Sequence, residues 1–120
     1  MSNPKNILIL DDDFNFKSLL ENNIRKKTDF RVFLASDGDR ALERIAAQDN
    51  KIDILTTDLI HSGIGGIELL EMVKSKYPEV KTVICTGLPS LHEDFTKHAD
   101  AILYKPFRFD EYLQVLHTLL

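Results

Sequence analysis

The stretch Ile7-Leu8-Ile9-Leu10-Asp11-Asp12-Asp13, near the start of the 120-residue chain, decides the fold. Its four apolar residues follow one another without polar alternation, which is typical of a strand buried on both faces, and the aspartates come directly after them. Such strands occur in parallel sheets that helices cover on both sides. The stretch therefore predicts an α/β protein with acidic residues at the carboxyl end of a buried strand.

Short apolar runs alternate with amphipathic segments along the rest of the chain. Further strands are expected at 31–35, 52–56, 80–85 and 100–104. Helices are expected at 14–26, 38–48, 66–77, 90–98 and 109–120, and Ser90 with Glu93 has the spacing of a capping box at the start of the fourth. Either Asp37 or Asp39 is a candidate cap of the second helix. Five strand–helix units predict a doubly wound parallel sheet, with its ligand site at the carboxyl ends of the strands.

The composition fits one ordinary globular domain, expected at 1–120, and limits the functions to consider. Hydrophobic residues make up 43% of the chain and charged residues 28%. The formal net charge of −4 gives no reason to expect direct nucleic-acid binding. The single cysteine, Cys85, excludes an internal disulfide, is expected to be a buried and unreactive thiol, and favours a cytoplasmic location. No apolar stretch approaches the roughly 20 residues of a membrane span, so no membrane partner is expected.

Polar residues directly follow four of the expected strands. The first strand ends at Asp11-Asp12-Asp13, the third at Asp58, the fourth at Thr86 and the fifth at Lys105. Two carboxylates about 4 Å apart repel by roughly 4 kcal/mol at an effective dielectric constant of about 20. Several acids at one rim of a sheet should therefore bind protons or recruit a cation, and Mg²⁺ or Mn²⁺ suits oxygen ligands of this kind.

The same rim has the parts needed to make an aspartyl phosphate. Lys105 supplies a mobile positive charge for a phosphate, and Thr86 supplies a hydroxyl donor. The carboxylate of Asp58 is a candidate nucleophile beside a divalent cation. Acids after strands can also be simple turn residues or helix caps. This alternative explains any one of these groups taken alone, but it explains the full set of four poorly.

Together these residues resemble the receiver domains of two-component signalling, and the resemblance covers essentially the whole chain. The matching segments are 7–13, 53–58, 63–66, 83–87 and 104–107. The resemblance implies a flavodoxin-like (βα)5 fold with strand order 2-1-3-4-5. It also implies a phosphorelay response regulator that is a switch rather than an enzyme. A sensor histidine kinase or phosphotransfer protein would be its phosphodonor, and its output partner would be unknown.

The resemblance also implies roles for single residues at the rim. Asp58 is implied to be the phosphoacceptor, with Thr86 and Lys105 binding its phosphoryl group. The implied ligands of Mg²⁺ or Mn²⁺ are Asp11, Asp12, Asp58 and the backbone carbonyl of Ile60, whereas Asp13 is expected to be a helix cap. Thr86 and the position of Ile102 are implied to form the switch, and the bond between Lys105 and Pro106 is implied to be cis.

Three departures from the family pattern bear on signalling. His61-Ser62 replaces the usual Met-Pro pair, which should loosen that loop. Ile102 replaces the usual switch aromatic, and Tyr104, on the same side of the strand, is a candidate substitute that is expected instead to be packed. The fourth helix is expected to be short. A binding module that keeps the fold but works without phosphorylation, a pseudo-receiver, is therefore kept as an alternative.

Two further expectations follow from the side chains at this rim. Ile60 and Leu88 flank the path of an attacking water in the family, and both are apolar, so the phosphoryl group is expected to be long-lived. An enzyme or flavoprotein of similar topology is the third hypothesis. It is disfavoured because three aspartates after the first strand would repel a flavin phosphate, and because no further acid or base is evident for turnover.

Overall fold

The structure is a computed structural model, and it describes residues 4–47, 51–58, 65–91 and 93–120. Its strands are β1 (Asn6–Leu10), β2 (Arg31–Ala35), β3 (Ile54–Thr57), β4 (Lys81–Thr86) and β5 (Ala101–Tyr104). Its helices are α1 (Phe14–Lys27), α2 (Gly38–Ala46), α3 (Gly66–Lys76), α4 (Glu93–Thr96) and α5 (Phe109–Leu119). Strands and helices alternate as predicted, with most ends displaced by one or two residues.

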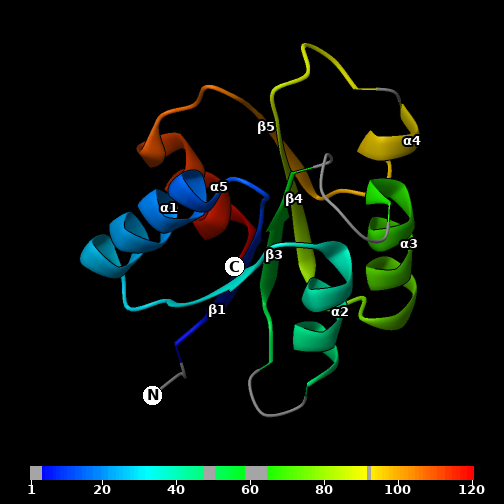
Figure 1. The fold of residues 1–120 in the computed structure, drawn as a ribbon, viewed down its shortest axis with the longest axis horizontal. Helices are drawn as coiled ribbons and strands as arrows, with labels where there is room; N and C mark the ends of the chain where they lie inside the picture. Colours follow the sequence, from blue (N-terminus) through cyan, green and yellow to red (C-terminus); the bar gives the residue numbers. More distant parts are fainter. Residues whose placement is uncertain (1–3, 48–50, 59–64, 92) are drawn as a thin grey trace.

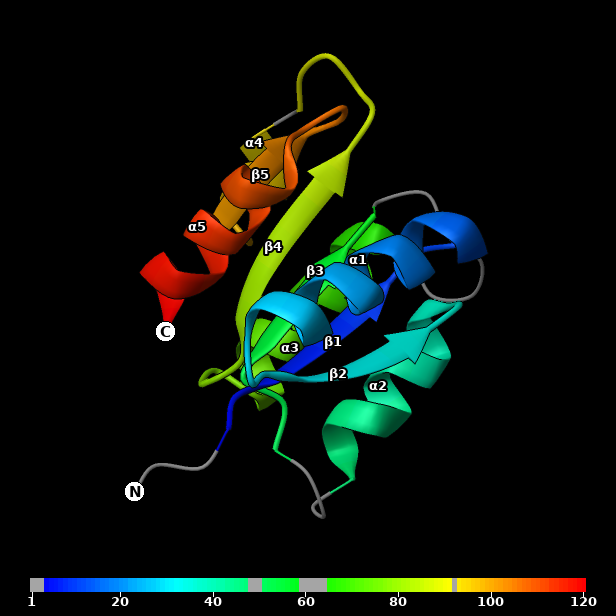
Figure 2. The ribbon, with the colours of Figure 1, turned by 90° about the vertical axis from the view of Figure 1, so that its left-hand side faces the viewer.

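The strands form one parallel sheet in the order β2-β1-β3-β4-β5, which confirms the predicted flavodoxin-like topology. Figure 1 shows α1 and α5 on one side of this sheet, with α2 and α3 on the other. Figure 2, turned by 90°, shows the strands side by side with α1 in front of them. Because all strands run the same way, their carboxyl ends share one edge of the sheet.

Two hydrophobic cores lie on the two faces of the sheet, and β1 contributes to both. Alternate residues of β1 point to opposite faces: Ile7 and Ile9 belong to the core beneath α1 and α5, whereas Leu8 and Leu10 belong to the core beneath α2 and α3. Every residue of β1 is buried. This two-sided burial is what the unbroken apolar run predicted, and it fixes the turn that carries the aspartates.

Helices α1 and α2 are capped by aspartates at this edge. Asp13 accepts a hydrogen bond from the backbone N–H of Phe16 at 3.1 Å, and Asp37 accepts one from the backbone N–H of Arg40 at 2.8 Å. The predicted cap at Asp13 is therefore confirmed, and of the two candidates for α2 it is Asp37 that caps. None of the helices in the described ranges is both long and apolar enough to cross a membrane.

Helix α4 is shorter than predicted, spanning Glu93–Thr96 rather than residues 90–98. The predicted capping box of Ser90 and Glu93 is wrong, because Glu93 is the first helical residue. At the other end, the N–H groups of His98 and Ala99 reach carbonyls only three residues back, at 3.2 and 3.3 Å. Such bonds tighten and end a helix. The described residues between β4 and β5 therefore contain little regular structure.

Candidate functional site

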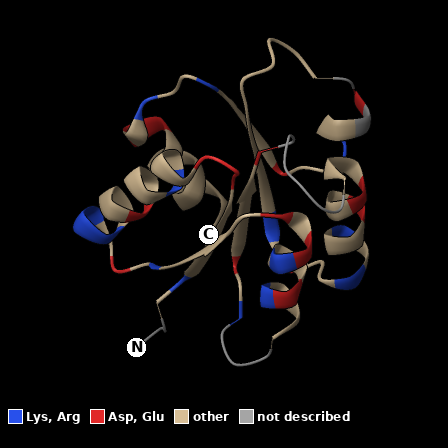
Figure 3. Ribbon diagram, viewed as in Figure 1, with Lys and Arg blue, Asp and Glu red and all other residues tan. Residues whose placement is uncertain are grey.

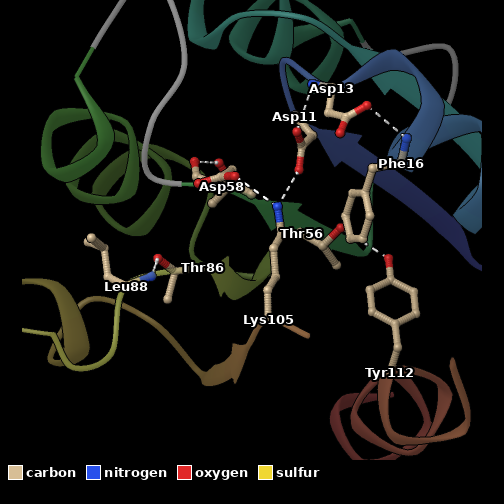
Figure 4. Close-up of polar contacts among 10 residues, drawn as sticks. Asp11, Asp13, Phe16, Thr56, Asp58, Thr86, Leu88, Lys105 and Tyr112 are labelled. Atoms are coloured by element: carbon tan, nitrogen blue, oxygen red, sulfur yellow. Dashed lines mark hydrogen bonds and ion pairs between the residues drawn. The ribbon is translucent and has the colours of Figure 1, made fainter. Parts of the chain in front are cut away.

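The ammonium group of Lys105 joins two aspartates from different strands. Its Nζ donates hydrogen bonds to Asp11 Oδ2 at 3.0 Å and to Asp58 Oδ2 at 2.9 Å, as Figure 4 shows. Asp11 follows β1, Asp58 follows β3 and Lys105 follows β5, so the sheet edge brings together three groups that are far apart in the chain. These are three of the residues that the sequence pointed to.

The turn after β1 fixes the carboxylate of Asp11. This residue is only 4% exposed, and its Oδ1 accepts the backbone N–H of Asp13 at 2.8 Å, which leaves Oδ2 for Lys105. Its own backbone N–H donates to the carbonyl of Ala35 at 3.3 Å. The backbone N–H of Asp58 donates to the carbonyl of Leu10 at 3.0 Å, so both acids are held by the backbones of neighbouring strands.

The charge balance keeps Lys105 protonated. Partial burial is the largest single influence on its pKa and lowers it, but the hydrogen bonds and negative charges of Asp58 and Asp11 together raise the pKa above its ordinary value. In Figure 3 the ribbon is red, for acidic residues, where β1 and β3 end. The site is thus an acidic rim with one ammonium group between two carboxylates.

Thr86 lies beside Lys105 at the end of the neighbouring strand. Its carbonyl accepts the backbone N–H of Lys105 at 2.6 Å, and its hydroxyl accepts the backbone N–H of Leu88 at 3.1 Å. The residue is only 1% exposed. The hydroxyl is therefore held at the same edge of the sheet, close to the start of the loop that leads to α4.

The predicted switch region on β5 is less covered than expected. Ile102 is half-buried and lies beside Ile84 of β4. The prediction that Tyr104 is packed is wrong, because 44% of this residue is exposed. Tyr104 is the last residue of β5, a strand at the edge of the sheet. The alternation of side chains along a strand predicts that Tyr104 and Ile102 lie on the same face, but it does not predict whether another element covers that face at the end of the strand.

The remaining predicted site residues differ in how they are placed. Asp12 is exposed in the turn between β1 and α1. The bond between Lys105 and Pro106 is cis, as the family resemblance implied. Ile60, whose carbonyl was a predicted metal ligand, lies outside the described residues, as do His61 and Ser62. Cys85 is buried as predicted, and this burial is the main cause that raises the pKa of its thiol to about 12.

The donor set fits a single Mg²⁺. Within the described part of the chain, no three acidic, histidine or cysteine side chains are gathered as a ready metal cluster. However, Mg²⁺ in proteins is commonly held by one or two carboxylates, with water and phosphate oxygens completing its coordination. The carboxylates of Asp11 and Asp58 already share one cation, the ammonium group of Lys105, and Asp12 lies exposed in the adjoining turn.

Sequence reasoning missed one residue of this site, Phe16. Its ring lies against the ammonium group of Lys105, with 4.3 Å between Nζ and the ring centroid. The sequence pattern placed Phe16 only on the apolar face of the first helix. The available signal was its position in the first turn of a helix that starts directly after the aspartates, where a side chain can reach back over the strand ends.

Comparison with known proteins agrees with this geometry. The family model for the response regulator receiver domain matches residues 7–117. The chain belongs to this family. It is 29% identical to the chemotaxis protein CheY of Listeria monocytogenes over 114 residues, covering 92% of this chain and 93% of that protein. It is 31% identical to the sporulation initiation phosphotransferase F of Bacillus subtilis over 114 residues, covering 92% of this chain and 89% of that protein.

Solved receiver structures have the same fold. The response regulator TrrA of Thermotoga maritima, whose crystal structure is a complex with Mg²⁺-BeF, gives a TM-score of 0.85 at 26% identity over 97% of this chain and 99% of that chain. A Francisella response regulator receiver domain gives a TM-score of 0.84 at 26% identity over 98% of this chain and 96% of that chain. The present chain is thus a receiver domain, and receiver domains are signalling modules rather than classical enzymes.

Proposed function

We propose that this receiver domain accepts a phosphoryl group on Asp58 and uses it to switch a surface that partners bind. The observation that supports this most directly is the ammonium group of Lys105, which lies 2.9 Å from Asp58 and 3.0 Å from Asp11 at the edge where four strands end in polar residues. The side chain of Asp58 is 17% exposed, so a phosphodonor can reach it from solvent. The donor would be a phosphohistidine of a sensor kinase or a phosphotransfer protein in the cytoplasm.

In this mechanism each residue of the rim has a separate task. A carboxylate oxygen of Asp58 attacks phosphorus in line, so that a P–O bond forms as the P–N bond of the donor breaks. Lys105 starts within hydrogen-bond distance of the attacking carboxylate, and it needs only a small movement to pair with an oxygen of the transferred group. The hydroxyl of Thr86 would bind a second phosphoryl oxygen.

Asp11, Asp12 and Asp58, with the carbonyl of Ile60, are the residues that would hold Mg²⁺ here. The bound ion would offset negative charge on the phosphoryl oxygens. With the ion bound, Asp11 would exchange part of its pairing with Lys105 for the metal, which would leave the ammonium group for the phosphoryl group. The family resemblance assigns these ligands, and the shared ammonium group of Lys105 supports the assignment for Asp11 and Asp58.

Intact-mass measurement after incubation with a small phosphodonor tests the proposal. The wild-type protein should gain one phosphoryl group when Mg²⁺ is present and little when the metal is chelated. Asp58→Asn should gain none, whereas Asp29→Asn, at an exposed aspartate that precedes β2 at the opposite edge of the sheet, should behave as wild type. Equal labelling of wild type and Asp58→Asn, or no labelling of wild type, would contradict the proposal and would favour the pseudo-receiver alternative.

A further inference from the structure

The ring of Phe16 is the third group that contacts the ammonium group of Lys105, after the carboxylates of Asp11 and Asp58. The ammonium group contacts carboxylates from β1 and β3 and lies over the ring of Phe16 from α1, 4.3 Å from its centroid (Figure 4). A cation this close to an aromatic face is attracted by the ring quadrupole. We infer that Phe16 is a positioning residue that holds the Lys105 ammonium group at the site of phosphoryl transfer. This inference rests on the proposed function for its effect on chemistry.

The ring of Phe16 is itself held in place by other aromatic side chains. It meets the ring of Phe107 edge-on, with 6.0 Å between centroids and an interplanar angle of 80°. Phe107 stacks on Tyr112 of α5 at 5.9 Å. Tyr112 is fully buried, and its hydroxyl lies 3.0 Å from the hydroxyl of Thr56 on β3. The ring is thus supported on a packed cluster that connects to the strand of Asp58, so it is a fixed surface for the lysine.

Lys105 needs such a surface because its other partners change during the proposed reaction. A lysine side chain is flexible and carries a compact charge, so it loses considerable rotamer freedom when it is held in one place. Asp11 cannot pair fully with the lysine while it also binds a metal ion. The ring of Phe16 neither titrates nor coordinates Mg²⁺, so its attraction for the ammonium group persists through this exchange.

A purely structural role for Phe16 predicts different behaviour. If the ring only fills space beside Phe107, an aliphatic side chain of similar size would serve nearly as well. If the ring attracts the ammonium group, an aromatic replacement retains the function and an aliphatic one does not. Phe14 provides a matched control, because it lies in the same turn of α1 and is 69% exposed.

The test compares Phe16→Leu, Phe16→Tyr and Phe14→Leu with wild type in two measurements. The first is an NMR spectrum of isotope-labelled lysine side chains in the absence of phosphodonor, with the Lys105 signal identified by its loss in Lys105→Arg. The ring current of Phe16 should shift the Lys105 methylene signals upfield. Phe16→Leu should remove that shift, whereas Phe16→Tyr and Phe14→Leu should keep it. A thermal melt of each variant shows that it is folded.

The second measurement is the rate of phosphorylation at saturating phosphodonor and Mg²⁺. Phe16→Leu should lower this rate roughly three- to tenfold, and Phe16→Tyr should stay within about twofold of wild type. An unchanged lysine spectrum in Phe16→Leu, or an equal loss of rate in Phe16→Leu and Phe16→Tyr, would overturn the inference. A wild-type protein that is not phosphorylated would overturn the proposed function instead, and the lysine spectrum alone would then decide whether the ring holds the ammonium group.

Discussion

The two sides of the site around Lys105 are built very differently. On the α1–α5 side, an aromatic cluster consisting of Phe16, Phe107, Phe109 and Tyr112 packs between the two helices and the sheet. On the α4–β5 side, α4 is a four-residue helix and Tyr104 is 44% exposed. Lys105 follows β5 in the chain, yet its side chain lies against the aromatic cluster. The well-packed support of the site is therefore the α1–α5 side.

This difference bears on where a phosphorylation signal can be transmitted. The expected switch of Thr86 and Ile102 lies on the less covered side, and Ile102 has neither a ring nor a hydroxyl group to exchange partners. The role of these two residues in switching stays a prediction.

The largest effect on stability is expected when the buried tyrosine of the α1–α5 side is truncated and compared with the exposed tyrosine of the α4–β5 side. Tyr112→Ala should lower the free energy of unfolding by about 3–5 kcal/mol, because Tyr112 is fully buried and the deletion leaves a cavity. Tyr104→Ala should lower it by at most about 1 kcal/mol, since that side chain is 44% exposed at the end of an edge strand. Urea unfolding followed by circular dichroism measures both. Similar losses in the two variants would mean that the two sides are equally packed.

Alkaline pH should lower the free energy of unfolding through two buried groups in the core beneath α1 and α5. Burial, the largest cause, raises the pKa of the Cys85 thiol from 9.0 to about 12 and also raises the pKa of the Tyr112 hydroxyl. Above pH 9 the thiol ionises in the unfolded chain but stays protonated in the folded one. Its contribution to stability is therefore fully present below pH 9 and is lost as the pH rises toward 12.

Urea unfolding measured at intervals from about pH 8 to about pH 11 tests this alkaline loss. Cys85→Ala should flatten the decline, leaving the part that comes from Tyr112 and the other titrating groups. A profile for Cys85→Ala with the same slope as that of wild type would show that the thiol is not titrating in the way its burial requires.

A smaller effect is expected from the hydroxyl pair that joins α5 to β3. The hydroxyls of Thr56 and Tyr112 lie 3.0 Å apart in the buried core, so Tyr112→Phe and Thr56→Val should each lower stability by about 1–2 kcal/mol. In the double variant the losses should not add, because neither hydroxyl then remains buried without a partner. Tyr104→Phe, on the exposed side, is the control and should leave stability unchanged. Fully additive losses would mean that the two hydroxyls do not interact.

The smallest effect concerns Leu88, in the loop that leads to α4. The apolar side chains of Ile60 and Leu88 cannot orient an attacking water, so the phosphorylated protein should retain its label for far longer than seconds. Leu88 is 41% exposed. If its side chain shields the phosphoryl group from water, Leu88→Ala should shorten the half-life by about threefold at most, a change of less than roughly 1 kcal/mol in the barrier. The decay is followed by intact mass after the donor is removed. A wild-type half-life of seconds would contradict the expectation.

The polar residues at the carboxyl ends of the strands were predictable from the sequence, because an unbroken apolar run directly before Asp11 is typical of a strand buried in a parallel sheet. Once the parallel sheet is assigned, the positions of Asp58 and Lys105 at the same edge follow from topology alone. The caps at Asp13 and Asp37 followed from local chemistry that acts over three residues. These features depend on the backbone conformation, and the spacing of apolar and polar residues in the sequence follows the period of that conformation.

The features that escaped prediction depend on which side chains cover one another. A helical pattern places Phe16 on the inner face of its helix, but it does not say that the ring meets Lys105, which lies far away in the chain. The exposure of Tyr104 depends on the lack of a covering element at the end of an edge strand. The expectation that α4 is short is confirmed, but its predicted start is wrong, because the spacing of Ser90 and Glu93 is by itself a weak signal for a capping box.

We propose that Asp11, Asp58 and Lys105 form a site that takes a phosphoryl group together with Mg²⁺. Fluorine NMR of the protein with beryllofluoride, a stable phosphoryl mimic, tests this claim most directly. A bound signal should appear in wild type only when Mg²⁺ is also present, and it should be absent in Asp58→Asn and weakened in Lys105→Met. No bound signal in wild type, or an equal signal in Asp58→Asn, would contradict the claim.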